Sequence, residues 1–321
     1  MKGAMRFLLA AIGLALAHAA AAQYPARPLH WVVPYTPAGI TDSVTRIVTQ
    51  KLEGALGQPV VVENKPGANS IVGVEAVSRS AADGYTALTV IAAHAANATL
   101  YAGKLPFDPV KSFAPVSLVG IAPLILVVNN DFPARDVKEL VQYARANPGK
   151  VSFGSSGVGS AAHLTTELLK QTAGIEMVHV PYKGTAPALA GLLAGDIQVL
   201  VDVPITMLPQ VRGGKVRALG LFATKRIAGA PEVPTVAEAG GPVIEASTWV
   251  MFLVPAGTPR EIVARLSAET AKVLATAEIR ARFEQLGVEP VGNSPADATK
   301  FLEEEIAKWA GVITTAKVKP E

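Results

Sequence analysis

The chain has 321 residues, a formal net charge of +3 and no cysteine. A disulfide framework and thiol chemistry are therefore excluded. Removal of the N-terminal segment, with Lys2 and Arg6, would lower the net charge by two, from +3 to +1. Such a nearly balanced charge argues against nucleic-acid binding, which requires a basic patch. About 300 remaining residues exceed the usual size of a single core, so two domains are expected.

The N-terminal segment has the organisation of a secretory signal peptide. Lys2 and Arg6 form a positive region, residues 7–17 are apolar, and Ala20-Ala21-Ala22 is a small-residue cleavage site. The apolar run is too short for a bilayer, which needs about 20 such residues. We expect residues 1–22 to be removed near Ala22/Gln23 and the mature protein to work in the periplasm. The alternative, a buried N-terminal helix, does not account for the complete pattern.

From residue 29 onward, short β-rich runs alternate with amphipathic helical stretches, which predicts βαβ units and a largely parallel sheet. The apolar face of residues 41–56 is typical of a helix that packs on such a sheet. The first predicted series is, in chain order, strand 29–34, helix 41–56, strand 60–63, helix 71–80, strand 85–92 and strand 124–129.

A second series follows and ends in two helices with start signals. Thr258-Pro259-Arg260-Glu261 predicts a capping box with proline at the first helical position, and Ser294-Pro295-Ala296-Asp297 repeats it before a last helix that ends near Ile313. The predicted elements before these helices are helix 136–147, strand 150–154, helix 160–173, strand 177–180, helix 186–194, and strands 199–202, 216–222 and 249–254.

Two apolar strands, 124–129 and 249–254, bracket the second series, and each could carry the chain from one domain to the other. We therefore expect a discontinuous first domain, residues 23–123 with 247–321, and an inserted second domain, residues 124–246. Two crossover strands would form a hinge, and hinge closure over a ligand is a common response of such domain pairs.

Three loops join a predicted strand to a predicted helix, where open α/β sheets bind their ligands. The first loop, residues 34–42, contains Tyr35, Thr36, Gly39, Thr41 and Asp42, of which the last two could cap the helix. Free N–H groups at a helix start attract an anion, and a carboxylate is the simplest candidate. The alternative is an ordinary βα turn.

The second loop, residues 153–163, is rich in glycine and serine. It contains Ser155, Ser156, Gly159, Ser160 and His163, so it offers close backbone approach, amide donors and hydroxyl groups. Its spacing matches neither a Walker loop nor a dinucleotide fingerprint nor a nucleophile elbow. We expect a binding loop, in which His163 either contacts the ligand or packs in the first helical turn.

The third loop, residues 180–187, contains Lys183, Gly184 and Thr185. Lys183 could neutralise a carboxylate or be solvated. Asp202 ends an apolar strand, where a carboxylate needs hydrogen-bond partners or water. It either binds an amine or hydroxyl group of the ligand or makes a hydrogen bond at a helix cap or at the hinge. Histidines and carboxylates show no metal-ligand or catalytic spacing, so we expect no metal, no cofactor and no enzymatic activity.

Several motifs, in order, resemble the Bug-type extracytoplasmic receptors of tripartite tricarboxylate transporters, and the resemblance extends from about Tyr24 to Val318. The motifs are residues 24–25 (YP), 33–42 (VPYTPAGITD), 56–68 (LGQPVVVENKPGA), 83–86 (DGYT), 179–184 (HVPYKG), 233–240 (VPTVAEAG) and 255–259 (PAGTP).

The resemblance implies a type II periplasmic-binding-protein fold, with two α/β domains around a ligand cleft. It also implies that residues 35–42 and 155–163 hold a ligand carboxylate through amides, hydroxyls and bridging waters, opposite Lys183–Thr185 and Asp202. Two departures stand out. The family's Pro-Pro-Gly-Gly is Thr36-Pro37-Ala38-Gly39 here, and Ala38 restricts φ; residues 68–71 replace a more glycine-rich pattern, which puts a ligand contact there in doubt.

Together these features predict a monomeric extracytoplasmic receptor that binds a small organic acid or amino acid and delivers it to the membrane subunits of a transporter. The alternative is a receptor of similar fold that acts as the ligand sensor of a periplasmic signalling pathway. An enzyme is a distant third interpretation.

Overall fold

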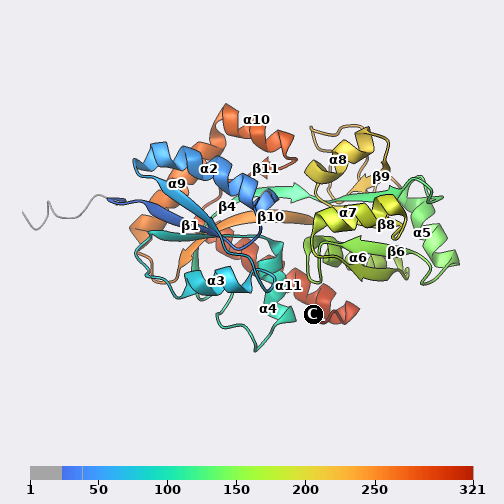
Figure 1. The fold of residues 1–321 in the computed structure, drawn as a ribbon, viewed down its shortest axis with the longest axis horizontal. Coiled ribbons are helices and arrows are strands. Elements are labelled where there is room, and N and C mark those ends of the chain that lie inside the picture. Colours follow the sequence, from blue (N-terminus) through green and yellow to red (C-terminus); the bar gives the residue numbers. More distant parts are fainter. Residues whose placement is uncertain (1–23, 38, 321) are drawn as a thin grey trace, which may run out of the picture.

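The structure is a computed structural model that describes residues 24–37 and 39–320. The predicted signal peptide and the predicted effect of Ala38 therefore lie outside the described residues. The strands form two separate sheets, and each sheet with its helices makes one of two units that lie side by side (Figure 1). We call these units the first lobe and the second lobe.

The first lobe is built on a six-stranded sheet with the order β11-β4-β10-β3-β1-β2. β1 is parallel to β2 and β3, whereas β10 is antiparallel to β3 and β4. The strands are β1 (Leu29–Val33), β2 (Val60–Asn64), β3 (Thr86–Val90), β4 (Phe113–Pro123), β10 (Ser247–Pro255) and β11 (Glu289–Pro290). The helices are α2 (Ile40–Leu56), α3 (Ile71–Ser78), α4 (Ala92–Leu100), α9 (Arg260–Ala275), α10 (Ala277–Gln285) and α11 (Pro295–Ala316).

The second lobe is built on a five-stranded sheet with the order β7-β6-β8-β5-β9. β6 is parallel to β7 and β8, whereas β5 is antiparallel to β8 and β9. The strands are β5 (Ile125–Asn129), β6 (Ser152–Ser155), β7 (Val178–Pro181), β8 (Val199–Asp202) and β9 (Val216–Leu221). The helices are α5 (Val137–Ala146), α6 (Ala161–Ala173), α7 (Thr185–Ala194) and α8 (Pro204–Arg212).

The predicted α/β architecture is confirmed, and both sheets prove to be mixed rather than largely parallel. The sequence patterns missed β4, β11, α4, α8 and α10. β4 contains Pro115, Gly120 and Pro123, which are unfavourable inside strands, and α8 contains Pro209. α4 is buried around almost its whole circumference, so it lacks the amphipathic periodicity on which helix prediction relies.

Helix starts confirm one predicted capping motif and correct two others. Ser294 caps α11, and its hydroxyl accepts from the Asp297 N–H. At α9 the cap is Pro259, and Thr258 instead donates its hydroxyl to Pro255 O. At α2 the cap is Gly39 without a side-chain bond, so Thr41 and Asp42 lie inside the first turn and the predicted cap there was wrong.

The chain passes between the lobes twice, and the two crossings are hydrogen-bonded to each other. The first follows β4 directly into β5, and the second runs from β9 to β10. The Leu124 N–H donates to Ala246 O, the Phe222 N–H donates to Leu124 O, and the Ala246 N–H donates to Phe222 O. These hydrogen bonds between the two crossing segments support the predicted hinge and the predicted domain limits. Both remain predictions.

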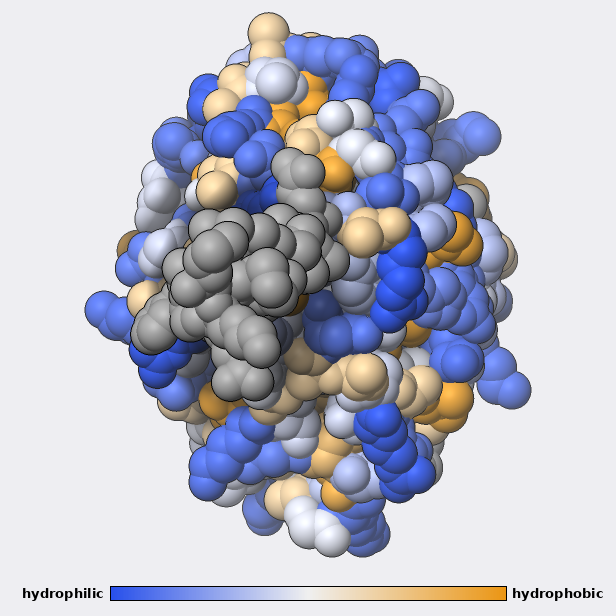
Figure 2. Space-filling model, turned by 90° about the vertical axis from the view of Figure 1, so that its left-hand side faces the viewer, coloured by the Kyte–Doolittle hydropathy of each residue, from blue (hydrophilic) through white to orange (hydrophobic). Residues whose placement is uncertain are grey.

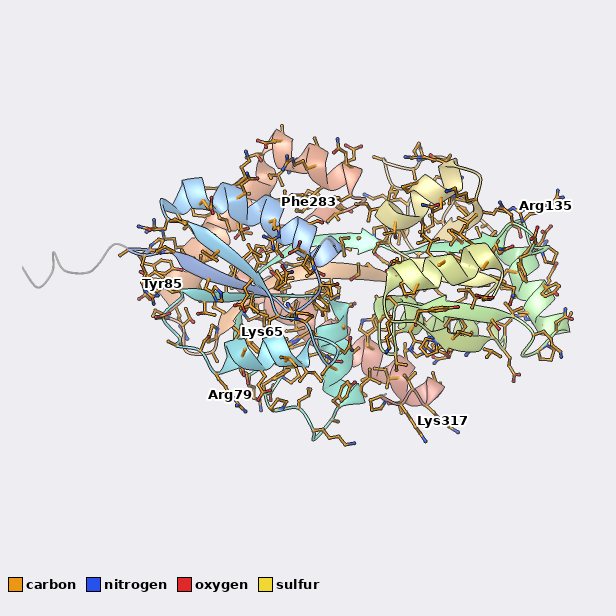
Figure 3. All side chains as sticks on the ribbon, viewed as in Figure 1. Lys65, Arg79, Tyr85, Arg135, Phe283 and Lys317 are labelled. Carbon is orange, nitrogen blue, oxygen red and sulfur yellow. The ribbon has the colours of Figure 1, made fainter. Side chains whose placement is uncertain are left out.

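α11 gives the lobes a further connection, because it packs against α4 of the first lobe and α6 of the second. The Gln171 side chain donates to Val312 O at 3.1 Å. In Figure 3 the labelled Lys317 marks the end of this helix, below the second lobe, and the labelled Arg79 and Arg135 lie on the first and second lobes.

Where Figure 2 colours the surface of the first lobe that faces away from the second, the residues are mostly hydrophilic, and the hydrophobic ones form small scattered groups. Within the described ranges, no helix combines the length and the apolar character needed to cross a membrane.

A buried carboxylate ties α11 to the first sheet. Glu305, 7% exposed, accepts from the indole N–H of Trp249 and of Trp309, each at 2.8 Å. Both tryptophans are fully buried, so neither indole has water as a substitute partner.

We expect Glu305→Ala to lower the free energy of unfolding by about 2 kcal/mol, because two buried donors lose their acceptor. Urea unfolding followed by tryptophan fluorescence measures the change. Glu304→Ala is the matched control, since the Glu304 side chain is 65% exposed and only weakly paired with Lys300. Equal stabilities of the two variants would contradict the structural role of Glu305.

Candidate functional site

Six junctions between a strand and a helix form the candidate site. β1, β2 and β3 run into α2, α3 and α4, and β6, β7 and β8 run into α6, α7 and α8. Because the strands within each group are parallel, their carboxyl ends share one edge of the sheet, where α/β proteins bind ligands.

The junctions of the two lobes meet at Gly159, in the loop between β6 and α6. A methyl group added at Gly159 would lie 2.3 Å from Leu100 Cδ1 and 3.7 Å from Asn69 Nδ2, both in the first lobe. The first loop belongs to the junctions of the first lobe, and the second loop belongs to those of the second lobe. These two groups of junctions are therefore in contact.

Asp42 anchors the first loop. Its carboxylate is buried and accepts from Arg46 Nε at 3.0 Å and from Asn64 Nδ2 at 2.9 Å. Asn64 also donates to Tyr35 O at 3.0 Å. Asp42 thus holds the loop backbone in place while Arg46 offsets its charge. Thr41 is buried one residue earlier, whereas Thr36 and Gly39 are exposed.

Two buried hydroxyl groups, one in the first loop and one in the loop after β2, lie near each other and have no other hydrogen-bond partner among the described residues. They are Tyr35 OH and Ser70 Oγ. Burial raises the pKa of Tyr35, and the nearby Ser70 hydroxyl opposes this shift, so the phenol remains protonated at neutral pH. Unpartnered buried donors are costly unless water or a ligand satisfies them.

The loop after β2 is unusual in its backbone. Ala68, Asn69 and Ser70 all have positive φ, at 44°, 48° and 77°, which costs roughly 1–2 kcal/mol per residue outside glycine. Asn69 is held there by Asn97 of α4, through Asn69 Nδ2 to Asn97 Oδ1 and Asn97 Nδ2 to Asn69 O, both at 2.8 Å. The sequence departs here from the family's more glycine-rich pattern, and asparagine is one of the residues that tolerate this conformation.

The second loop is shaped by its glycines and by a cap. Gly157 and Gly159 have φ of 130° and 78°, a region that favours glycine. Ser160 caps α6 by accepting from the His163 N–H at 3.2 Å. Ser155 is fully buried and lies 2.7 Å from His179 Nε2, while Ser156 is only partly buried.

His163 lies behind the second loop, on α6. It is 4% exposed, its Nδ1 accepts from the Gly159 N–H at 3.1 Å, and its ring stacks on His179 at a centroid distance of 3.8 Å. Burial lowers the pKa of His163 to about 3, assisted by the nearby His179 and Lys170, and lowers that of His179 to about 4, assisted by Lys170. Both rings are neutral at physiological pH.

The third loop brings Thr185 to Asp202. Thr185 Oγ1 donates to Asp202 Oδ2 at 2.8 Å, and the Val203 N–H donates to Oδ1 at 2.7 Å. Asp202 is 5% exposed, and burial raises its pKa to about 6 against these two hydrogen bonds. Gly184 starts α7 with a φ of 111°, and Lys183 is exposed.

These groups suit the binding of a polar anion. They offer hydroxyls, loop amides and helix starts, and the side chains described contain no cluster of three or more residues able to hold a metal ion. A groove of about 440 Å³ lies elsewhere, between residues 223–229 and α10, but its charged residues are exposed. We place the site at the junctions because buried polar groups gather there.

Comparison with known proteins decides the family. Residues 44–318 match the family described as Tripartite tricarboxylate transporter family receptor. The chain belongs to this receptor family. Receptors of the family are periplasmic substrate-binding proteins and not enzymes, which confirms the resemblance seen in the sequence and the expectation of no enzymatic activity.

Individual relatives cover almost the whole receptor. BugT of Bordetella pertussis is 37% identical over 98% of this chain and 99% of its own. The solved R. palustris protein Rpa4515 with adipate is 34% identical, with a TM-score of 0.85 over 93% of this chain and 100% of its own. MatC from Rhodopseudomonas palustris with bound malate is 32% identical, with a TM-score of 0.79 over 90% and 100%. These neighbours confirm the two-lobed periplasmic-binding fold.

Proposed function

We propose that the receptor binds a small carboxylate where the junctions of the two lobes meet and delivers it to the membrane subunits of a tripartite tricarboxylate transporter. One observation carries the proposal. The starts of α2, α6 and α7 lie at the junction edges of the two sheets, and Gly159 brings the second-lobe edge against the first. Helix starts present free N–H groups and favour anions.

Relatives support the class of ligand. The solved R. palustris proteins hold adipate and malate, and both molecules are dicarboxylates. Because their chains align with nearly the whole receptor, an organic acid is the first class to test. Export with cleavage near Ala22/Gln23 belongs to the same proposal, and N-terminal sequencing of the exported protein tests it.

The site residues divide by how they would act. We expect Ser156, the loop amides and the Tyr35 hydroxyl to contact a carboxylate, whereas Asp42, Ser155 and His163 would act through the loops they hold. The proposed carboxylate side comprises Tyr35, Thr36, Gly39, Thr41, Asp42, Ser155, Ser156, Gly159, Ser160 and His163. The proposed opposite wall comprises Lys183, Gly184, Thr185 and Asp202.

A thermal-shift screen of malate, adipate, citrate and amino acids tests the ligand class. A ligand at 100 times its dissociation constant adds about 2.7 kcal/mol of stability, which gives a clear rise in melting temperature. If no carboxylate raises it while another class does, the proposed ligand is wrong. Receptor-dependent uptake into vesicles that contain the transporter subunits tests delivery; a sensor would bind ligand without supporting uptake.

We expect Ser156→Leu to weaken the binding of the best carboxylate at least about tenfold, or 1.4 kcal/mol, because a branched side chain would fill space beside the loop amides. Calorimetry measures the affinity. Thr172→Leu, an exposed change on α6 of the same lobe, is the control. Unchanged affinity in Ser156→Leu would remove the second loop from the site.

A further inference from the structure

A stack of three aromatic rings, of which Phe153 and His163 are buried and His179 is partly buried, lies against the second loop. A simple carboxylate pocket does not require such a stack. Phe153, His179 and His163 stack in that order, with centroid distances of 4.9 Å and 3.8 Å between neighbours. Phe153 comes from β6, His179 from β7 and His163 from α6. The stack therefore joins the two strands that flank the loop to the helix that follows it.

Each histidine is bonded to the loop itself. His163 Nδ1 accepts from the Gly159 N–H at 3.1 Å. His179 Nε2 lies 2.7 Å from Ser155 Oγ, which in turn accepts from the Gly157 N–H at 3.2 Å. The N–H groups of Gly157 and Gly159 therefore point toward Ser155 and His163. Glycine would otherwise allow this backbone many conformations, so the two hydrogen bonds fix the orientation of the peptide groups between them.

We propose that His163 and His179 are positioning residues for ligand binding: His163 orients the loop through the Gly159 amide, and His179 orients it through Ser155. The inference rests on the proposed function, since it concerns how the same loop is made ready for a carboxylate. It assigns His163 an indirect role in place of a direct contact, and it adds His179 to the site.

The geometry determines the tautomer of His163. A backbone N–H can only donate, so Nδ1 must carry a lone pair and the ring proton must be on Nε2. Nε2 faces Glu167 Oε1 at 3.9 Å, and Glu167 is itself paired with Lys170 at 2.7 Å. The charged or titratable groups that bear on His163 are thus Glu167 and Lys170 from α6 and His179 from β7.

Protonation of His163 would set an N–H against the Gly159 N–H, so the arrangement requires the neutral ring. Its lowered pKa of about 3 agrees with this requirement. A positioning ring should therefore remain neutral at pH 5, where an ordinary histidine, with a pKa of about 6.5, is largely protonated.

The binding test uses malate and adipate as probes with the full mature receptor. We expect His163→Leu to weaken the better probe at least about tenfold at pH 7, and His163→Asn, which offers an acceptor near the Nδ1 position, to recover most of that loss. His30→Leu is the control, because His30 is half exposed and pairs with Glu63 in the first sheet. Affinity in His163→Leu equal to that of the wild type overturns the proposal.

The second test needs no ligand and no variant. NMR of the wild-type receptor with ¹⁵N-labelled histidine should show His163 as the neutral Nε2–H tautomer at pH 7 and still neutral at pH 5. A protonated Nδ1 at either pH overturns the positioning role even if His163→Leu fails to fold. If neither probe binds while the tautomer is as expected, the proposed ligand class fails and the loop arrangement stands.

Discussion

Replacing Asp202 with asparagine is expected to stabilise the ligand-free receptor by about 3 kcal/mol above pH 6, because the shift in pKa from 3.8 to about 6 corresponds to about 1.4 kcal/mol per unit. The cause is burial of an ionised carboxylate whose two hydrogen bonds, from Thr185 and Val203, do not fully replace water. Asparagine keeps an acceptor for Val203 and carries no charge.

The pH dependence of this effect has a definite sign. The folded state raises the pKa of Asp202, so the folded protein binds more protons than the unfolded chain between pH 3.8 and about 6. The contribution of Asp202 to stability is therefore complete below pH 3.8 and is lost as the pH rises through about 6. Wild type and Asp202→Asn should be similar near pH 4 and diverge above it.

Urea unfolding at a series of pH values measures the difference, and Asp196→Asn, an exposed carboxylate in the same lobe, is the control. If Asp202→Asn shows no gain at pH 7, the carboxylate is already compensated without ligand.

The same substitution distinguishes ligands. Ionised Asp202 accepts from a hydroxyl or an amine, and the hydroxyl is the group that malate has and adipate lacks. We therefore expect Asp202→Asn to weaken malate about 10–100-fold, the range for a hydrogen bond to a charged group. Adipate, which has no hydroxyl, should bind as well or better. Calorimetry with both acids tests this, and equal effects on the two would make Asp202 a structural residue.

Adding a single methyl group at Gly159 should affect both stability and binding. Gly159→Ala places a side chain at a φ of 78°, which costs roughly 1–2 kcal/mol of stability. Its Cβ would also lie 2.3 Å from Cδ1 of the buried Leu100. Because Leu100 is buried, its side chain has little room to move aside, and we expect the lobes to separate instead. Separation works against a ligand that contacts both lobes, so affinity should fall about 30-fold, in line with about 2 kcal/mol for overpacking.

Two companion variants separate the two causes. Gly174→Ala has a similar φ of 61° and no atom within 4 Å of the added carbon, so it should lose stability without losing affinity. Gly159→Ala combined with Leu100→Ala removes the overlap and should recover affinity but not stability. Small-angle scattering reports whether Gly159→Ala remains open with saturating ligand. A compact, tightly binding Gly159→Ala receptor would contradict the contact between the lobes.

Local patterns predicted much of this fold. Alternating apolar runs indicated the α/β architecture, and the ordered motifs identified the receptor family. The same patterns missed α4 and β4, because a helix buried on nearly all sides has no polar face and a strand with two prolines resembles a turn. Thr258 shows a further limit: it occupies a capping motif, yet its hydroxyl bonds to Pro255 O instead.

Local composition identified the loops that are able to hold an anion, because glycine, serine and threonine there permit close backbone approach and supply hydroxyls. It also singled out Asp202, since a carboxylate at the end of an apolar strand needs a partner. The partners of these residues follow from the packing of the lobes: Thr185 for Asp202, His163 for the Gly159 amide, and Leu100 for Gly159 across the lobes. Such contacts depend on how the sheets and helices pack, and local sequence does not encode the distance between residues far apart in the chain.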